Sequence, residues 1–209
     1  MTMKVLLLNG SPHKTGCTYT ALTEVERELN KCGLEAEHFW IGTKPTMGCI
    51  ACGKCLESRR CWYEKDRLNE FLGKLEEFDG FIFGTPIYYA GISGQLKSFM
   101  DRAFYGKAGM FCNKPAAAVV SCRRGGAMGG WEDVTRFFGM TNMPIVTSQY
   151  WNQVHGNTPE EVLQDLEGLQ TMRHLAQNMA WMLKCIEAGK KAGVVEPDVE
   201  PMIRTNFIR

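Results

Sequence analysis

The stretch MKVLLLNGSPHKTGCT, residues 3–18, contains the strongest fold signal in the chain. Its apolar run, Lys4–Asn9, lacks alternation, which is typical of a central parallel strand covered by helices on both faces. After a polar loop, the apolar residues of Leu22–Cys32 recur at helical spacing, and Gly33 suits the end of that helix. The stretch therefore predicts a strand, a loop and a helix in succession.

The same alternation continues along the chain. Helices are predicted around Leu68–Leu75, after a Ser93 cap, around Val134–Phe138 and from Thr158 to Gly189. Further strands are predicted at Glu35–Trp40, Phe81–Phe83, Ala116–Ser121 and Ile145–Thr147. Strands that alternate with helices indicate an α/β fold with a five-stranded parallel sheet, and ligands bind such sheets at the carboxyl ends of the strands.

Composition narrows the class of protein. The chain has 209 residues, of which 44% are hydrophobic and 22% charged, and its formal net charge is +1. These values predict a single domain, 1–209, with a cysteine insert at about 47–63 and an extended tail at about 190–209. A near-neutral chain without a long apolar run argues against nucleic-acid or membrane partners. We expect a cytoplasmic protein, because no signal peptide precedes the first strand.

The loop after the first strand has the chemistry of a phosphate site. A helix N-terminus offers free backbone N–H groups, and hydroxyl and basic side chains surround it here. A Walker A loop does not fit, because His13 and not Gly precedes Lys14-Thr15, and a dinucleotide fingerprint does not fit, because Gly10 and Gly16 stand alone. The alternative is an ordinary hydrophilic turn. The candidate residues are Ser11, His13, Gly16, Cys17 and Thr18.

The loops after the third and fourth strands combine aromatic surface with glycine. Such loops can hold a flat ring whose edge is bonded by backbone groups, although a tight loop with core aromatics fits as well. Two exposed arginines suit an anionic group or merely a solvated surface. The candidates are Thr85, Pro86, Ile87, Tyr88 and Tyr89, followed by Arg123, Arg124, Gly125 and Gly126.

The cysteine insert has the most specific spacing in the chain. Its thiols follow the pattern C-x2-C-x2-C-x5-C at Cys49, Cys52, Cys55 and Cys61. Thiolates at this density can enclose a 4Fe–4S cluster or a tetrahedral zinc, form a redox disulfide, or remain inert. Elsewhere, Asp101 and Arg102 are predicted to form a structural ion pair.

The residues 3–18, the GTPIYY stretch at 84–89 and the GQLK stretch at 94–97 together resemble the NADPH-dependent FMN reductases of the flavodoxin-like superfamily. The cysteine insert resembles that of the iron–sulfur flavoproteins in the same superfamily. This resemblance implies a three-layer sandwich with sheet order 2-1-3-4-5. It also implies FMN, with its phosphate at Ser11–Thr18 and its ring on Pro86–Tyr89 beside the Cys122–Gly126 loop.

The expected activity follows from that cofactor. NAD(P)H would reduce the flavin at N5, so no catalytic side chain is required. Electrons would pass to a quinone, an azo or nitro compound, free flavin or a redox protein such as ferredoxin. The residues expected to border the substrate are Tyr89, Trp151 and His155. The alternatives are an electron carrier without a small-molecule substrate and a zinc or thiol redox sensor. We expect a homo-oligomer, a dimer or tetramer, from the apolar tail.

Overall fold

The run Lys4–Asn9 forms β1 at the centre of a parallel sheet, with its side chains buried from Val5 onward. The computed structural model describes residues 2–197, 200–201, 203 and 205. The sheet order is β2-β1-β3-β5-β6, and a short β4 pairs antiparallel with β3. These strands are β1 (Lys4–Asn9), β2 (Glu35–Trp40), β3 (Gly80–Tyr88), β4 (Gly91–Ile92), β5 (Ala116–Cys122) and β6 (Gln153–His155).

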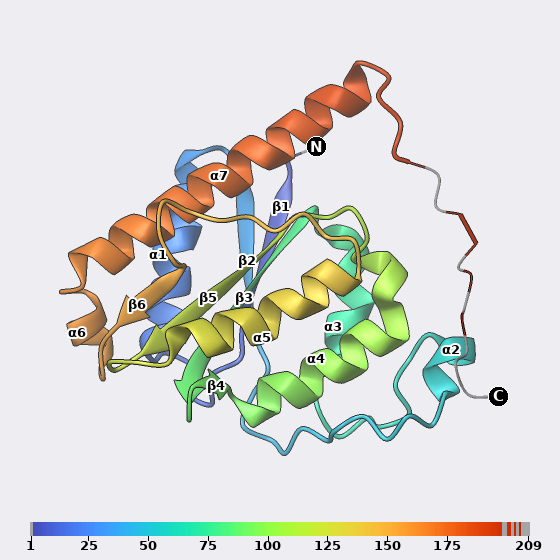
Figure 1. Ribbon diagram of the computed structural model, residues 1–209, viewed down its shortest axis with the longest axis horizontal. Coiled ribbons are helices and arrows are strands. Elements are labelled where there is room, and N and C mark those ends of the chain that lie inside the picture. Colours follow the sequence, from blue (N-terminus) through green and yellow to red (C-terminus); the bar gives the residue numbers. More distant parts are fainter. Residues whose placement is uncertain (1, 198–199, 202, 204, 206–209) are drawn as a thin grey trace.

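Helices cover both faces of the sheet (Figure 1). One apolar core packs α1 and α7 against one face, and the other packs α3, α4 and α5 against the opposite face. The three layers and the order of the five parallel strands confirm the predicted flavodoxin-like α/β fold. The helices are α1 (Cys17–Lys31), α2 (Lys54–Ser58), α3 (Leu68–Lys74), α4 (Gly94–Lys107), α5 (Ala127–Met140), α6 (Pro159–Val162) and α7 (Leu166–Lys191).

The fifth parallel strand lies later in the chain than predicted. Ile145 makes only an isolated bridge to Ala116, and pairing with β5 resumes at β6. Between them, the Ser148 hydroxyl donates to the Tyr150 carbonyl and to the Asn152 side chain. Such local bonds compete with a strand ladder, so the prediction of a strand over 145–147 was wrong.

The predicted C-terminal helix is divided in two. The Thr158 hydroxyl accepts from Glu161 N, as its capping pattern predicts, but α6 ends at Val162. Asp165 then caps α7 by accepting from Gly168 N, and α7 continues past Gly189 to Lys191. A second strong cap only a few residues after the first therefore restarts the helix.

The predicted tail at 190–209 lies partly outside the described residues. Its described part after Gly193 forms no helix or strand. In the described chain, none of the helices combines the length and the apolar character needed to cross a bilayer.

Candidate functional site

Three loops meet at the carboxyl edge of the sheet: residues 10–16 after β1, the β3–β4 hairpin, and residues 123–126 after β5. We call them the carboxyl-edge site. The first loop is bonded internally, because Ser11 N donates to Asn9 Oδ1 at 2.9 Å and His13 N donates to Ser11 Oγ at 3.1 Å. Gly10 N donates to the Gly84 carbonyl of β3 at 2.8 Å. The loop is therefore fixed by side-chain oxygens of Asn9 and Ser11 and by the backbone of β3.

The helix starts at this edge differ in a way that indicates ligand binding. α4 and α7 are closed by side-chain caps from Ser93 and Asp165. α1 and α5 begin after Gly16 and Gly126, and neither glycine supplies a capping side chain. Their first N–H groups remain available to an anion. Two open helix starts at one edge fit a ligand that carries negative charge at two points.

The predicted phosphate residues occupy two different environments. Ser11 is buried in the loop. Its hydroxyl oxygen accepts from His13 N, which leaves the hydroxyl hydrogen available to donate to a ligand. The Thr18 hydroxyl is instead bonded to the Ser121 hydroxyl at 2.8 Å, beneath the loop. Cys17 points its sulfur toward the Gly156 carbonyl at 3.7 Å, and burial raises the pKa of its thiol. At positions 17 and 18, therefore, the backbone N–H groups and not the side chains are available to bind an anion.

The β3–β4 hairpin presents aromatic surface on a strained turn. Tyr88 pairs with Gly91, and the two residues between them, Tyr89 and Ala90, both have positive φ angles of 50° and 61°. That is the geometry of a type I′ turn, which normally takes Asn or Gly. Tyr89 is fully exposed and Tyr88 half-exposed. A strained turn that displays a tyrosine to solvent is typical of a binding site.

Other hairpin residues support the turn. The buried Thr85 hydroxyl donates to the Pro86 carbonyl at 2.9 Å and accepts from Ser93 N at 3.3 Å. Ile87 packs against the small cluster of Val120, Cys122 and Ala127, next to Gly130 of α5. Thr85 and Ile87 therefore shape the site from beneath, and the tyrosines face outward.

The third loop fits closely onto the hairpin. A Cβ at Gly126 would lie 2.9 Å from Ala90 Cα, and one at Gly129 would lie 2.2 Å from the Ala90 carbonyl oxygen. Gly126 also has a φ of 89°. The open start of α5 is thus held against the turn by glycines, while Arg123 and Arg124 are exposed beside it. No motif in the sequence indicates the role of Gly129.

The two remaining candidates, Trp151 and His155, line one hollow together. Trp151 stacks on Tyr150 at 5.5 Å and also lines a second hollow of about 480 Å³ with Trp131 of α5. His155 N donates to Asp165 Oδ2 at 2.6 Å, and the hollow that His155 shares with Trp151 extends toward the start of α7. The structure thus brings Trp151 and His155 together, and Trp151 alone of the two also reaches α5.

The four cysteines of the insert line one hollow beside α4. It encloses about 380 Å³, part of it open to solvent, and Met47, Arg102 and Tyr105 complete its wall. Cys49 and Cys52 are exposed, and Cys55 packs against Gly106. Burial, followed by the neighbouring thiols, raises the pKa of Cys55. Four thiols around one hollow fit the donor set of a cluster with four iron corners.

Across the described ranges, no group of three His, Cys, Asp or Glu side chains is placed to hold one metal ion. A four-iron cluster takes one thiolate at each corner, so its ligating sulfurs lie farther apart than those around a single ion.

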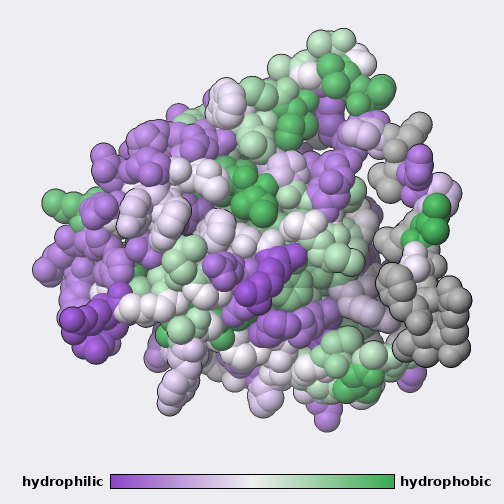
Figure 2. Space-filling model, viewed as in Figure 1, coloured by the Kyte–Doolittle hydropathy of each residue, from purple (hydrophilic) through white to green (hydrophobic). Residues whose placement is uncertain are grey.

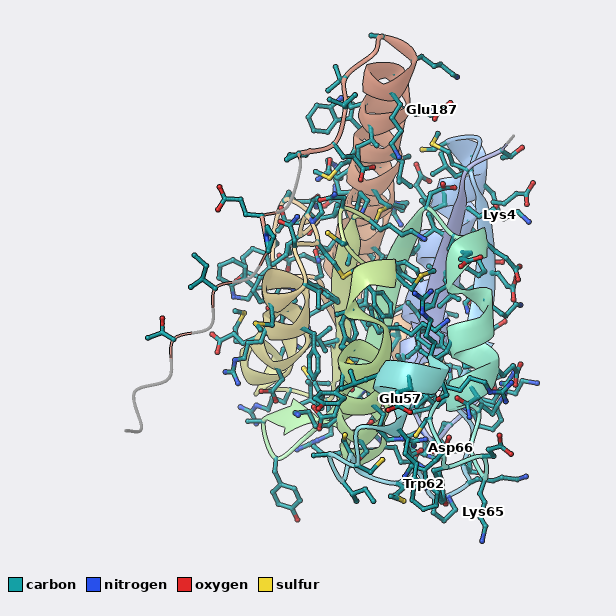
Figure 3. The ribbon with its side chains drawn as sticks, turned by 90° about the vertical axis from the view of Figure 1, so that its right-hand side faces the viewer. Lys4, Glu57, Trp62, Lys65, Asp66 and Glu187 are labelled. Carbon is teal, nitrogen blue, oxygen red and sulfur yellow. The ribbon has the colours of Figure 1, made fainter. Side chains whose placement is uncertain are left out.

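The ion pair predicted between Asp101 and Arg102 was wrong. Arg102 pairs with Asp66, and both side chains are almost fully buried, at 3% and 2% exposure. Asp101 pairs instead with Lys97 on the surface of α4. Adjacent residues on a helix point in different directions, so Arg102 faces the insert while Asp101 faces solvent. Figure 3 places Asp66 and Trp62 at the end of the molecule opposite Lys4 and Glu187.

Comparisons with known proteins point to one family. The family model for NADPH-dependent FMN reductases matches residues 3–158. An iron–sulfur flavoprotein of Methanocaldococcus jannaschii is 33% identical over 193 residues, which cover 88% of this chain and 100% of that protein.

Solved structures share the fold at low sequence identity. An NAD(P)H:quinone oxidoreductase from Methanothermobacter marburgensis has a TM-score of 0.61 at 15% identity, covering 86% of this chain and 98% of that one. An archaeal flavodoxin has a TM-score of 0.58 at 12% identity, covering 87% and 99%. With the two open helix starts and the cysteine hollow, these matches show that the chain belongs to the NADPH-dependent FMN reductase family, in its iron–sulfur flavoprotein branch, and is a flavodoxin-like oxidoreductase.

Proposed function

We propose that the protein is an FMN-dependent NAD(P)H oxidoreductase that passes electrons to an oxidised acceptor. The acceptor is a quinone, an azo or nitro compound, free flavin or a redox protein. The observation that carries this proposal is the pair of open helix starts, α1 and α5, on either side of the β3–β4 hairpin.

FMN supplies the redox chemistry, because its N5 accepts a hydride and the reduced ring releases electrons. The chain's residues bind and orient it. The start of α1, with Ser11 and His13, holds the phosphate, and the hairpin from Pro86 to Tyr89 supports the ring. Backbone N–H groups at Gly125 and Gly126, beside Arg123 and Arg124, stabilise negative charge on the reduced ring.

We further propose that Cys49, Cys52, Cys55 and Cys61 hold a 4Fe–4S cluster. Such a cluster carries single electrons and would allow the protein to exchange them with a redox partner. The donor set around one hollow supports this assignment. The insert follows α4 from Lys44, whose carbonyl accepts from Gln95 Nε2, to Cys55 beside Gly106. It therefore leaves the carboxyl edge and runs about two to three helical turns along α4.

The cysteine hollow also favours a second function, an iron–sulfur electron carrier without a small-molecule substrate. Its exposed rim includes Ile50 and Trp62, with 60% and 46% of their surface accessible. An apolar rim suits brief docking of a redox protein such as ferredoxin. Low turnover with NAD(P)H and fast exchange with a redox protein would favour this carrier.

We propose that the protein forms a dimer or tetramer. The exposed aromatics Tyr88, Tyr150 and Trp151 lie at the carboxyl-edge site, and the apolar Val194 and Val195 are exposed after α7. Figure 2 shows hydrophobic residues gathered at the end of α7 on this face. Light scattering at micromolar concentration tests the proposal, and a monomeric mass would contradict it.

Rapid mixing tests the proposed reaction. FMN-loaded protein is mixed anaerobically with NADPH or NADH, and the flavin absorbance is followed. We expect bleaching within the turnover time and recovery on adding a quinone. FMN-loaded protein that neither nicotinamide reduces would refute the reductase and leave the carrier.

A further inference from the structure

Arg102 of α4 contacts the cysteine insert at both of its ends. Its Nη1 donates to the Met47 carbonyl at 3.2 Å, and its Nη2 donates to the Tyr63 carbonyl at 3.3 Å. Its guanidinium carbon also lies over the Tyr63 ring, 5.2 Å from the ring centre. One side chain thus closes a loop whose ends are far apart in sequence.

The same guanidinium reaches a cysteine sulfur. Its Nε donates to Cys61 Sγ at 3.3 Å, and the remaining donors on both terminal nitrogens bond the Asp66 carboxylate. All five N–H donors therefore have acceptors, which a lysine could not provide. Burial lowers the pKa of Arg102, but the bonds to Asp66 and Cys61 outweigh it and raise the pKa overall.

A neighbouring residue fixes the backbone of that cysteine without touching its sulfur. Cys61 N donates to Asn69 Oδ1 at 2.9 Å, and Asn69 Nδ2 donates to the Cys61 carbonyl at 2.8 Å. Cys61 is therefore held at three points by α3 and α4, while Cys49 and Cys52 are exposed. Position comes from Asn69 and Arg102 together, but charge at the sulfur comes from Arg102 alone.

From this geometry we infer that Arg102 is a positioning residue that closes the cysteine insert and, with Asp66, sets the reduction potential of the cluster proposed above. The part that concerns the potential rests on the proposed function. Reduction adds one electron, hence one negative charge, to the cluster. A cation that donates to a ligating sulfur stabilises this charge and raises the potential, and the Asp66 carboxylate opposes it.

Two substitutions should shift the reduction potential in opposite directions, which distinguishes this role from simple support of the fold. Arg102→Gln removes the charge and lowers the potential, whereas Asp66→Asn removes the opposing charge and raises it. Each change corresponds to about tenfold in the equilibrium constant, or about 59 mV for one electron. Arg102→Lys retains the charge without the forked donors, so its potential falls less than that of Arg102→Gln.

The test is a redox titration of anaerobically reconstituted protein, followed by electron paramagnetic resonance. Asp101→Asn on the surface of α4 is the matched control and leaves the potential unchanged. If Arg102→Gln holds no iron, Arg102→Lys and Asp66→Asn still give the two signs. Suppose the Arg102 and Asp66 variants bind as much iron as wild type. Potentials equal to that of wild type, or shifts of both in the same direction, would then overturn the inference.

Closure of the insert is tested without a cluster. Iron-free, FMN-loaded protein is treated briefly with trypsin, which cleaves after the exposed Lys54, Arg59 and Arg60. Arg102→Gln should increase cleavage there at least several-fold over wild type and Asp101→Asn. Unchanged cleavage would overturn the closing role. If the wild type binds no iron after reconstitution, the proposed cluster and the role of Arg102 in its potential are both refuted. The closing role of Arg102, which the trypsin experiment tests, is not affected.

Discussion

At the carboxyl-edge site, glycines and single hydrogen bonds from several residues hold the loops, whereas in the cysteine insert one buried guanidinium joins both ends. Gly126 and Gly129 let α5 approach Ala90 closely, and Gly10 N bonds directly to the Gly84 carbonyl. The Arg102 side chain contacts Met47, Cys61 and Tyr63, and Asn69 adds two bonds to the backbone of Cys61. An added methyl group should therefore damage the first region most, and a lost charge the second.

The largest effect in this comparison is expected from Gly129→Ala. Its new Cβ would lie 2.2 Å from the Ala90 carbonyl oxygen, which is backbone and cannot rotate away. We expect a loss of about 1–3 kcal/mol in stability and of at least tenfold in FMN affinity. Urea unfolding and flavin fluorescence titration measure the two effects.

Gly139→Ala is the control on the same helix, because nothing lies within 4 Å of its Cβ position. It should be neutral or stabilise by up to about 1 kcal/mol, since alanine favours a helix. Equal effects at the two glycines would show that the hairpin contact is not what shapes the FMN site.

A narrower effect, on FMN affinity but not on stability, is expected from Ser11→Ala, which removes a hydroxyl from the β1–α1 loop. A hydrogen bond to a charged group contributes about 1.5–3 kcal/mol, so FMN affinity should fall about ten- to a hundredfold. Thr18→Val removes the bond to Ser121 instead, so it should cost about 1 kcal/mol of stability and little affinity. Isothermal titration with FMN distinguishes them. Unchanged affinity in Ser11→Ala would place the phosphate elsewhere.

The smallest effect is expected from Ser93→Ala, at the closed start of α4. Its hydroxyl accepts from Leu96 N and donates to the Gly10 carbonyl. Loss of this cap should cost about 1 kcal/mol in thermal unfolding while FMN affinity changes less than threefold. A strong loss of FMN affinity would mean that α4, and not only α1 and α5, takes part in binding.

The sequence predicted the strands of the sheet because they are buried apolar runs separated by helical periods, as in Lys4–Asn9, whereas the strand order came from the resemblance to the FMN reductases. It misplaced the last strand, since Ser148 and Asn152 replace ladder bonds with side-chain bonds that no periodicity reveals. It also paired Arg102 with its neighbour Asp101, because only the tertiary structure shows that Asp66 approaches from the insert.

The site was predicted unevenly for a similar reason. Motif spacing identified the three loops and the four cysteines, and the structure groups those cysteines in one hollow. Motif spacing could not distinguish Ser11 from Thr18, whose hydroxyl is bonded to Ser121 of β5. Gly129 and Asn69 were missed because a close approach and a backbone clamp leave no pattern in the sequence.

The most direct test of the account is a count of iron and FMN per chain after anaerobic reconstitution. We expect one FMN and about four irons in the wild type, and far fewer irons in Cys52→Ser. Cys185→Ser, which changes an exposed cysteine on α7, should retain all of them. A protein that binds FMN but no iron would contradict the account and leave a flavin reductase without a cluster.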